Sequence, residues 1–86
     1  MNFKEFKMYA DIKHSKKLVV DVREQLADLI YKQSRGVVAH NLAFRILNAE
    51  GDIEINSAEN DVITSILNLC TPQFQDSFNH NVEHNE

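Results

Sequence analysis

The chain has 86 residues, of which 43% are apolar, and a formal net charge of −4 at pH 7; this length predicts one small domain. Such a domain buries only about 60–65% of the surface that its unfolded chain exposes, which leaves little volume for a deep substrate cavity. No apolar run approaches the ~20 residues of a membrane-spanning helix, and no continuous apolar stretch of a secretory signal is found near Met1. The single cysteine, Cys70, cannot form an internal disulfide. These features predict a cytoplasmic protein without a membrane segment.

The first predicted element is a strand over residues 6–12, where apolar and polar side chains alternate with the period of a half-buried strand. The polar residues 13–16 then predict a turn, and the apolar segment 18–20 returns as the second strand of a hairpin. A helix is the alternative for this region, because Phe3, Phe6 and Ala10 recur every three to four positions.

Two helices follow the hairpin. Asp21, with Glu24 three residues later, resembles a capping box and predicts the start of a helix, which Gly36 ends. The apolar spacing of residues 37–47 predicts a second helix, ended by Gly51. The short connection makes the two helices neighbours in a helical hairpin.

A short strand and a third helix complete the predicted fold. Residues 53–55 alternate as a strand that joins the N-terminal hairpin. Asn56 and Glu59 match a capping box, and the broad apolar face that follows makes the third helix the most buried one. Thr71 ends this helix because a residue that precedes proline is disfavoured in the helical conformation. The predicted class is α+β, in the order β-β-α-α-β-α, with a short antiparallel sheet packed on three helices.

The last residues predict a polar flexible tail, residues 79–86, after a globular domain of residues 1–78, because they contain a single valine among Asn, His and Glu. Within this tail His80, Glu83 and His84 match H-x-x-E-H, the signature of inverted zinc hydrolases. That chemistry needs a stable helix, a third ligand and a pocket. We interpret the motif as a chance match, with adventitious metal binding by its two histidines as the milder alternative.

Residues 48–59 resemble the twelve-residue calcium loop of EF-hand proteins. The ligand positions are occupied by oxygen-bearing side chains: Asn48, Glu50, Asp52, Glu54 and Glu59. Ile53 stands where the EF-hand loop has the glycine of its sharp turn. The resemblance implies divalent-cation binding, which is the second functional hypothesis. The leading hypothesis, a protein-interaction module, requires no cofactor.

The charge is divided unevenly along the chain, which bears on partners rather than on fold. Residues 1–20 contain five lysines against two carboxylates, whereas residues 50–86 contain eight carboxylates and no lysine or arginine. The candidate docking residues are Glu50, Asp52 and Glu54 in the predicted strand, and Lys13, Lys16 and Lys17 at the hairpin turn. A two-fold homodimer could set the lysines of one copy near the carboxylates of the other.

No catalytic constellation is evident. His40 and Cys70 each lie among apolar residues at helical spacing, which predicts buried or partly buried structural roles rather than a nucleophilic pair. The leading hypothesis is a non-catalytic cytoplasmic protein-interaction module, regulatory or accessory, of the kind that phage and mobile elements encode. Association with nucleic acid is the third hypothesis. It ranks last because the basic cluster at the hairpin turn, which consists of Lys13, His14, Lys16 and Lys17, is small and lacks arginine.

Overall fold

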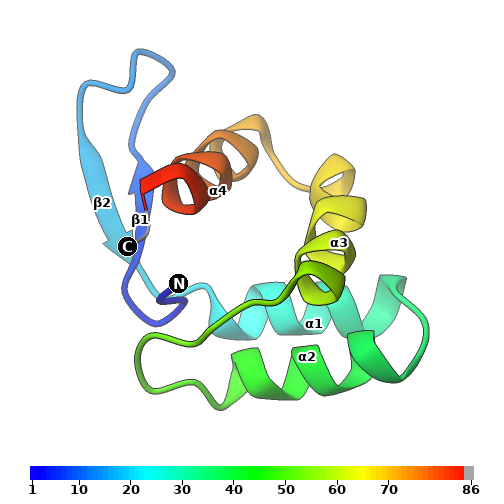
Figure 1. The fold of residues 1–86 in the computed structure, drawn as a ribbon. Helices are drawn as coiled ribbons and strands as arrows, with labels where there is room; N and C mark the ends of the chain where they lie inside the picture. Colours follow the sequence, from blue (N-terminus) through cyan, green and yellow to red (C-terminus); the bar gives the residue numbers. More distant parts are fainter. Residues whose placement is uncertain (85–86) are drawn as a thin grey trace.

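The computed structural model describes the backbone of residues 1–84 and the side chains of residues 1–82. Within this part of the chain, a two-stranded antiparallel sheet and four α-helices follow one another in the order β-β-α-α-α-α (Figure 1). The predicted α+β class is confirmed, whereas the predicted order is wrong at the third strand. None of the helices in residues 1–84 is both long and apolar enough to cross a membrane.

The N-terminal hairpin consists of β1, Phe6–Tyr9, and β2, Lys17–Val20. The register places Phe6 opposite Val20 and Tyr9 opposite Lys17. The predicted hairpin is therefore confirmed over its helical alternative, although β1 is shorter than predicted and Ile12 is almost fully exposed.

Helices α1, Arg23–Gln33, and α2, Val37–Leu47, lie side by side (Figure 1). The predicted capping box at the start of α1 does not form; instead, the Asp21 carboxylate accepts a hydrogen bond from the Arg23 backbone N–H at 3.1 Å. Gly36 lies beyond the end of α1 and immediately precedes α2, with a φ of 97° in the left-handed region that favours glycine.

Helix α3, Ser57–Ile66, begins with the predicted capping box. The Asn56 side chain accepts from the Glu59 N–H at 2.8 Å, and the Asn56 N–H donates to the Glu59 carboxylate at 3.1 Å. A short 3₁₀ helix, η1, Leu67–Leu69, follows α3 and leads to Pro72, which opens the last helix rather than only ending the third.

The predicted strand at 53–55 is absent. Its segment makes only an isolated antiparallel bridge between Asn2 and Asp52, beside a hydrogen bond from the Ile53 N–H to the Met1 carbonyl at 3.0 Å. It therefore pairs with residues that precede β1 and does not extend the hairpin. The reason is that the outer edge of β1 is already occupied by another element.

That element is α4, Pro72–His84, which continues past Phe78, where the sequence predicted the folded domain to end. Three side chains four positions apart on α4 bond the outward backbone groups of β1. Ser77 accepts from the Tyr9 N–H at 2.9 Å, Gln73 donates to the Tyr9 carbonyl at 2.6 Å, and Asn81 donates to the Lys7 carbonyl at 2.8 Å. Residues 79–84 are thus helical, and residues 85–86 of the predicted tail lie outside the described residues.

Aromatic residues from both ends of the chain join the hairpin to α4. The Phe6 ring stacks on Phe74 with centroids 5.4 Å apart and on Phe3 with centroids 6.1 Å apart. The largest fully buried apolar side chains are Phe3, Phe6, Phe78, Ile30, Leu42, Ile46, Ile63 and Val22. The core therefore runs through all elements and leaves the outer face of α1 and α2 uncovered.

Candidate functional site

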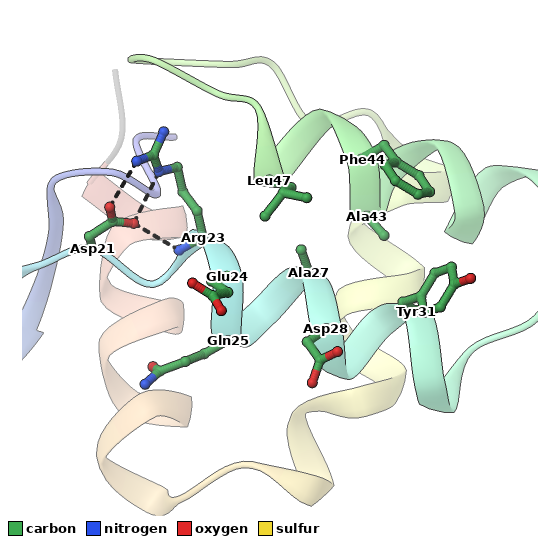
Figure 2. A pocket seen from close by; sticks show the side chains of 10 residues that line it. All are labelled: Asp21, Arg23, Glu24, Gln25, Ala27, Asp28, Tyr31, Ala43, Phe44 and Leu47. Atoms are coloured by element: carbon green, nitrogen blue, oxygen red, sulfur yellow. Dashed lines mark hydrogen bonds and ion pairs between the residues drawn. The ribbon is translucent and has the colours of Figure 1, made fainter.

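The pair formed by α1 and α2 has two different faces. The inner face, which belongs to the core, is lined by Leu26, Ile30, Ala39, Leu42 and Ile46, whereas the buried Ala27 and Ala43 border both the core and the other face. The other face carries an open groove of about 890 Å³ (Figure 2). The residues that line this α1–α2 groove are Asp21, Arg23, Glu24, Gln25, Ala27, Asp28, Tyr31, Ala43, Phe44 and Leu47.

The groove has an apolar end formed by aromatic side chains. The Tyr31 ring of α1 meets the Phe44 ring of α2 edge to face, with centroids 6.0 Å apart, and His40 lies 5.0 Å from Phe44. All three side chains are exposed. The prediction that His40 is at least partly buried is therefore wrong, because its position four residues before Phe44 places it on the same outward face.

Helix α2 carries exposed apolar side chains outside its core face, beside the exposed polar residues His40, Asn41 and Arg45. Val37 is 75% exposed and Phe44 is 44% exposed, and Val38 and Leu47 are also exposed. Large apolar side chains that gather on an exposed helix face are typical of an interaction surface.

The opposite side of the groove is acidic. Asp21 pairs with Arg23 at 2.9 Å, and the hydrogen bond from the Arg23 side chain lowers the pKa of Asp21 below its ordinary value (Figure 2). Asp28 pairs with Lys32 at 3.0 Å. Glu24 has no cationic partner within 4 Å among residues 1–82. The α1 rim therefore offers carboxylates, whereas α2 has no acidic residue.

The predicted acidic docking residues have other roles in the structure. Glu50 lies 3.0 Å from the Lys4 ammonium, whose hydrogen bond lowers the pKa of Glu50. The Asp52 carboxylate lies 3.6 Å from the Met1 amino nitrogen. Glu54 is exposed, and its backbone carbonyl accepts a hydrogen bond from Arg45 at 2.8 Å. The carboxylates of Glu50 and Asp52 thus pair with cations of their own chain.

The predicted basic docking residues lie at the hairpin, away from those ion pairs. Lys17 Nζ lies 3.0 Å from Nε2 of His80, whose Nδ1 lies 2.9 Å from the Tyr9 hydroxyl. Lys13 and Lys16 are exposed in the connection between the strands. In the described part of the chain, no ion pair joins these lysines to Glu50, Asp52 or Glu54.

The structure also shows where the residues of the two metal-binding resemblances lie. His80 belongs to α4 and contacts Tyr9 and Lys17, while the side chains of Glu83 and His84 lie outside the described residues. In the EF-hand-like segment, the Glu59 carboxylate is engaged by Arg45 and by the Asn56 N–H. Residues 1–82 contain no group of three or more His, Cys, Asp or Glu side chains placed to hold a metal ion.

Cys70 lies in a second, smaller hollow of about 240 Å³ between β1, α1 and the start of α4. It is partly buried, as predicted, and its Sγ lies 3.6 Å from the Ile66 carbonyl. Burial raises the pKa of the Cys70 thiol, which therefore stays protonated near neutral pH. A protonated thiol is a poor nucleophile.

The residues that sequence reasoning missed are Tyr31, Phe44 and Leu47 of the α1–α2 groove. For Phe44 and Leu47 the signal was present in α2, where the apolar positions exceed one helix face, whereas Tyr31 lies in α1. Comparison with protein-family models, with curated proteins and with solved structures finds no match to this chain.

Proposed function

We propose that the protein is a non-catalytic interaction module that binds an amphipathic helix of another protein in the α1–α2 groove. The single observation that carries this proposal is the set of large exposed side chains that line the groove, Tyr31 of α1 and Phe44 and Leu47 of α2. Removing such side chains from water is the main favourable contribution to association.

The shape of the groove supports a helical partner. A groove between two adjacent helices can accept the apolar face of a third helix, with anchors spaced three and four residues apart. Tyr31 and Phe44 are suited to contact such anchors, because exposed aromatic residues dominate the binding energy of many interfaces. Val37 and Leu47 extend the apolar surface along α2 on both sides of Phe44.

The charge of the rim supports a partner with basic residues on one side. Glu24 and Asp28 follow the α1 side of the groove, and Lys32 is the nearest cation to Asp28. A partner lysine or arginine above Glu24 would form a cross-interface ion pair, which adds more to specificity and association rate than to affinity.

The alternative functions have less support. Calcium binding through residues 48–59 would require Glu59 to leave Arg45 and the Asn56 N–H. Nucleic-acid binding would rely on few cations, since Lys4, Arg23 and Arg45 already pair with carboxylates of this chain. We further propose a cytoplasmic, regulatory or accessory role, because the single cysteine, Cys70, cannot form an internal disulfide.

The proposal can be tested with a designed peptide and backbone NMR. The probe is a helical peptide with leucines on one face and lysines along one flank, and the control peptide has glutamates in place of the lysines. We expect the lysine peptide to shift the amide signals around Tyr31, Phe44 and Leu47, and the glutamate peptide to bind more weakly.

Two variants separate docking from folding. Phe44→Ala should weaken peptide binding at least about tenfold if Phe44 is an anchor, whereas Leu69→Ala, which truncates an exposed apolar residue outside the groove, should not. Absence of binding at millimolar peptide, or signal shifts confined to other elements, would contradict the proposal.

A further inference from the structure

The two outer edges of the hairpin differ. β1 lies between β2 and α4, and its outward groups at Lys7 and Tyr9 bond to side chains of α4 (Figure 1). β2 forms the other edge of the sheet, and nothing in the described chain pairs with that side. The protein therefore covers one edge of its sheet and leaves the other open.

The register defines which backbone groups the open edge presents. The Ala10 N–H donates to the Lys16 carbonyl at 2.9 Å, so the hydrogen-bonded pairs of the hairpin are Met8 with Leu18 and Phe6 with Val20. The N–H and C=O groups of Lys17 and Val19 consequently point away from β1. No hydrogen bond from residues 1–82 reaches them.

The side chains of β2 do not protect this edge. Leu18 is 51% exposed and Val19 is 65% exposed. Natural sheets usually block an open edge with a charge, a proline or a bulge. β2 has one such charge, Lys17 at its start, followed by three consecutive apolar residues, and Asp21 lies directly after the strand. An edge of this composition is suited to accept another strand.

We propose that this edge pairs with β2 of a second copy, antiparallel and centred on Val19, which joins the two hairpins into one four-stranded sheet. This interface shares only Asp21 with the α1–α2 groove. Val19 then lies opposite Val19 of the second copy, and Leu18 lies opposite Val20, so that apolar side chains are covered on both faces of the new sheet. Two-fold symmetry makes every contact occur twice.

Charge selects this register and favours a second copy as the occupant. Because the outward groups belong to odd-numbered residues, the allowed antiparallel registers differ by two residues. The register centred on Val19 sets Lys17 of each copy opposite Asp21 of the other. A shift by two residues sets Lys17 opposite Val19, and a further shift sets Lys17 opposite Lys17.

The two charged side chains already have partners within one chain. Lys17 contacts His80, and Asp21 pairs with Arg23, yet Lys17 and Asp21 are both substantially exposed. Cross-strand charge therefore fixes orientation, while the backbone hydrogen bonds and the contacts of Leu18 and Val19 supply most of the affinity. This arrangement differs from the sequence-based dimer, in which Lys13, Lys16 and Lys17 faced Glu50, Asp52 and Glu54.

Sedimentation equilibrium between about 10 µM and about 1 mM tests the proposal across the affinity range expected of a small interface. The wild-type chain should pass from a mass of 9.9 kDa to twice that mass. Val19→Lys should raise the dissociation constant at least about tenfold, because it places two ammonium groups at the centre of the interface. Lys13→Glu, a charge reversal outside the paired segment, should leave the constant unchanged. A wild-type chain of 9.9 kDa throughout this range would overturn the proposal.

A charge exchange tests the register independently of folding effects. Lys17→Glu and Asp21→Lys should each weaken self-association, because each variant alone sets like charges opposite one another. Their equimolar mixture should form a heterodimer, since both contacts between residues 17 and 21 then join opposite charges. A mixture that associates no better than either variant alone would overturn the register, as would a wild-type dimer that tolerates both single changes.

Discussion

The carboxylate of Glu59 lies against the guanidinium of Arg45, so that the first turn of α3 is tied to the last turn of α2. The Glu59 side chain is only 8% exposed. Burial alone would raise the pKa of Glu59, but the hydrogen bonds from Arg45 and the Asn56 N–H, together with the Arg45 charge, outweigh it and hold the pKa below its ordinary value. The capping box and the ion pair therefore share one carboxylate.

This contact predicts a stability difference that depends on pH. A carboxyl group whose pKa is lower in the folded state stabilises the fold above its unfolded pKa, and this contribution is lost as the pH falls through the folded pKa. We expect Glu59→Gln to lower the free energy of unfolding by about 1–3 kcal/mol at pH 7. The loss should shrink once the pH falls below the unfolded pKa, near 4.5.

Urea denaturation of both proteins at pH 7 and at acidic pH checks this expectation. Glu54→Gln is the matched control, because Arg45 contacts the backbone carbonyl of Glu54 and not its carboxylate. Equal losses at both pH values would show that the Glu59 charge contributes nothing.

A second prediction concerns the edge of β1. Ser77 is buried, and its hydroxyl accepts the Tyr9 N–H. Ser77→Ala leaves this partly buried N–H without a partner, and we expect a loss of about 1–3 kcal/mol in the free energy of unfolding. Ser65→Ala removes an exposed hydroxyl that bonds only within α3, so it should change stability by less than about 0.5 kcal/mol. Similar urea midpoints for the two variants would contradict the role assigned to Ser77.

A third prediction concerns calcium and the segment 48–59. Because Glu59 is held by Arg45, millimolar calcium should shift the melting temperature by less than about one degree. A ligand at 100 times its dissociation constant adds about 2.7 kcal/mol, which raises the melting temperature of so small a domain by many degrees. A large upward shift that Glu59→Gln abolishes would favour the EF-hand hypothesis instead.

A fourth prediction uses the two glycines. Gly36 has a φ of 97°, and an added methyl group would meet no atom within 4 Å, so Gly36→Ala costs backbone strain alone. We expect a loss of roughly 1–3 kcal/mol in the free energy of unfolding, because this combination of φ and ψ is essentially restricted to glycine. Gly51 has equal space without this φ, so Gly51→Ala should be neutral or slightly stabilising. Equal thermal shifts for the two variants would be the contrary result.

The parts of the fold that the sequence predicted are those set by local signals. Asn56 and Glu59 define the start of α3 from four consecutive residues, and alternation favoured the strand β1 over the helical alternative, which the structure excludes. The prediction of a third strand was wrong because alternation at 53–55 does not reveal that the edge of β1 is already covered. Nothing in the local pattern says which partner an extended segment will find.

The sequence also did not predict the full length of helix α4 or the α1–α2 groove, for a related reason. Gln73, Ser77 and Asn81 are polar residues of the kind that usually face solvent, yet their side chains form hydrogen bonds with the backbone of β1. Conversely, Phe44 and Leu47 are of residue types that usually lie in a core, yet their side chains are exposed. In both cases side-chain polarity does not identify what lies opposite, which depends on residues distant in sequence.

The bonds between α4 and β1 also impose an order on folding. They join residues 64 to 74 positions apart, whereas the contacts among α1, α2 and α3 are closer in sequence. A two-stranded hairpin is marginal in water by itself, so β1 and β2 cannot become stable until residues 73–81 have been synthesised. The hairpin therefore becomes stable only once α4 has packed against it, and until then its strands are open to proteases and to pairing with other chains.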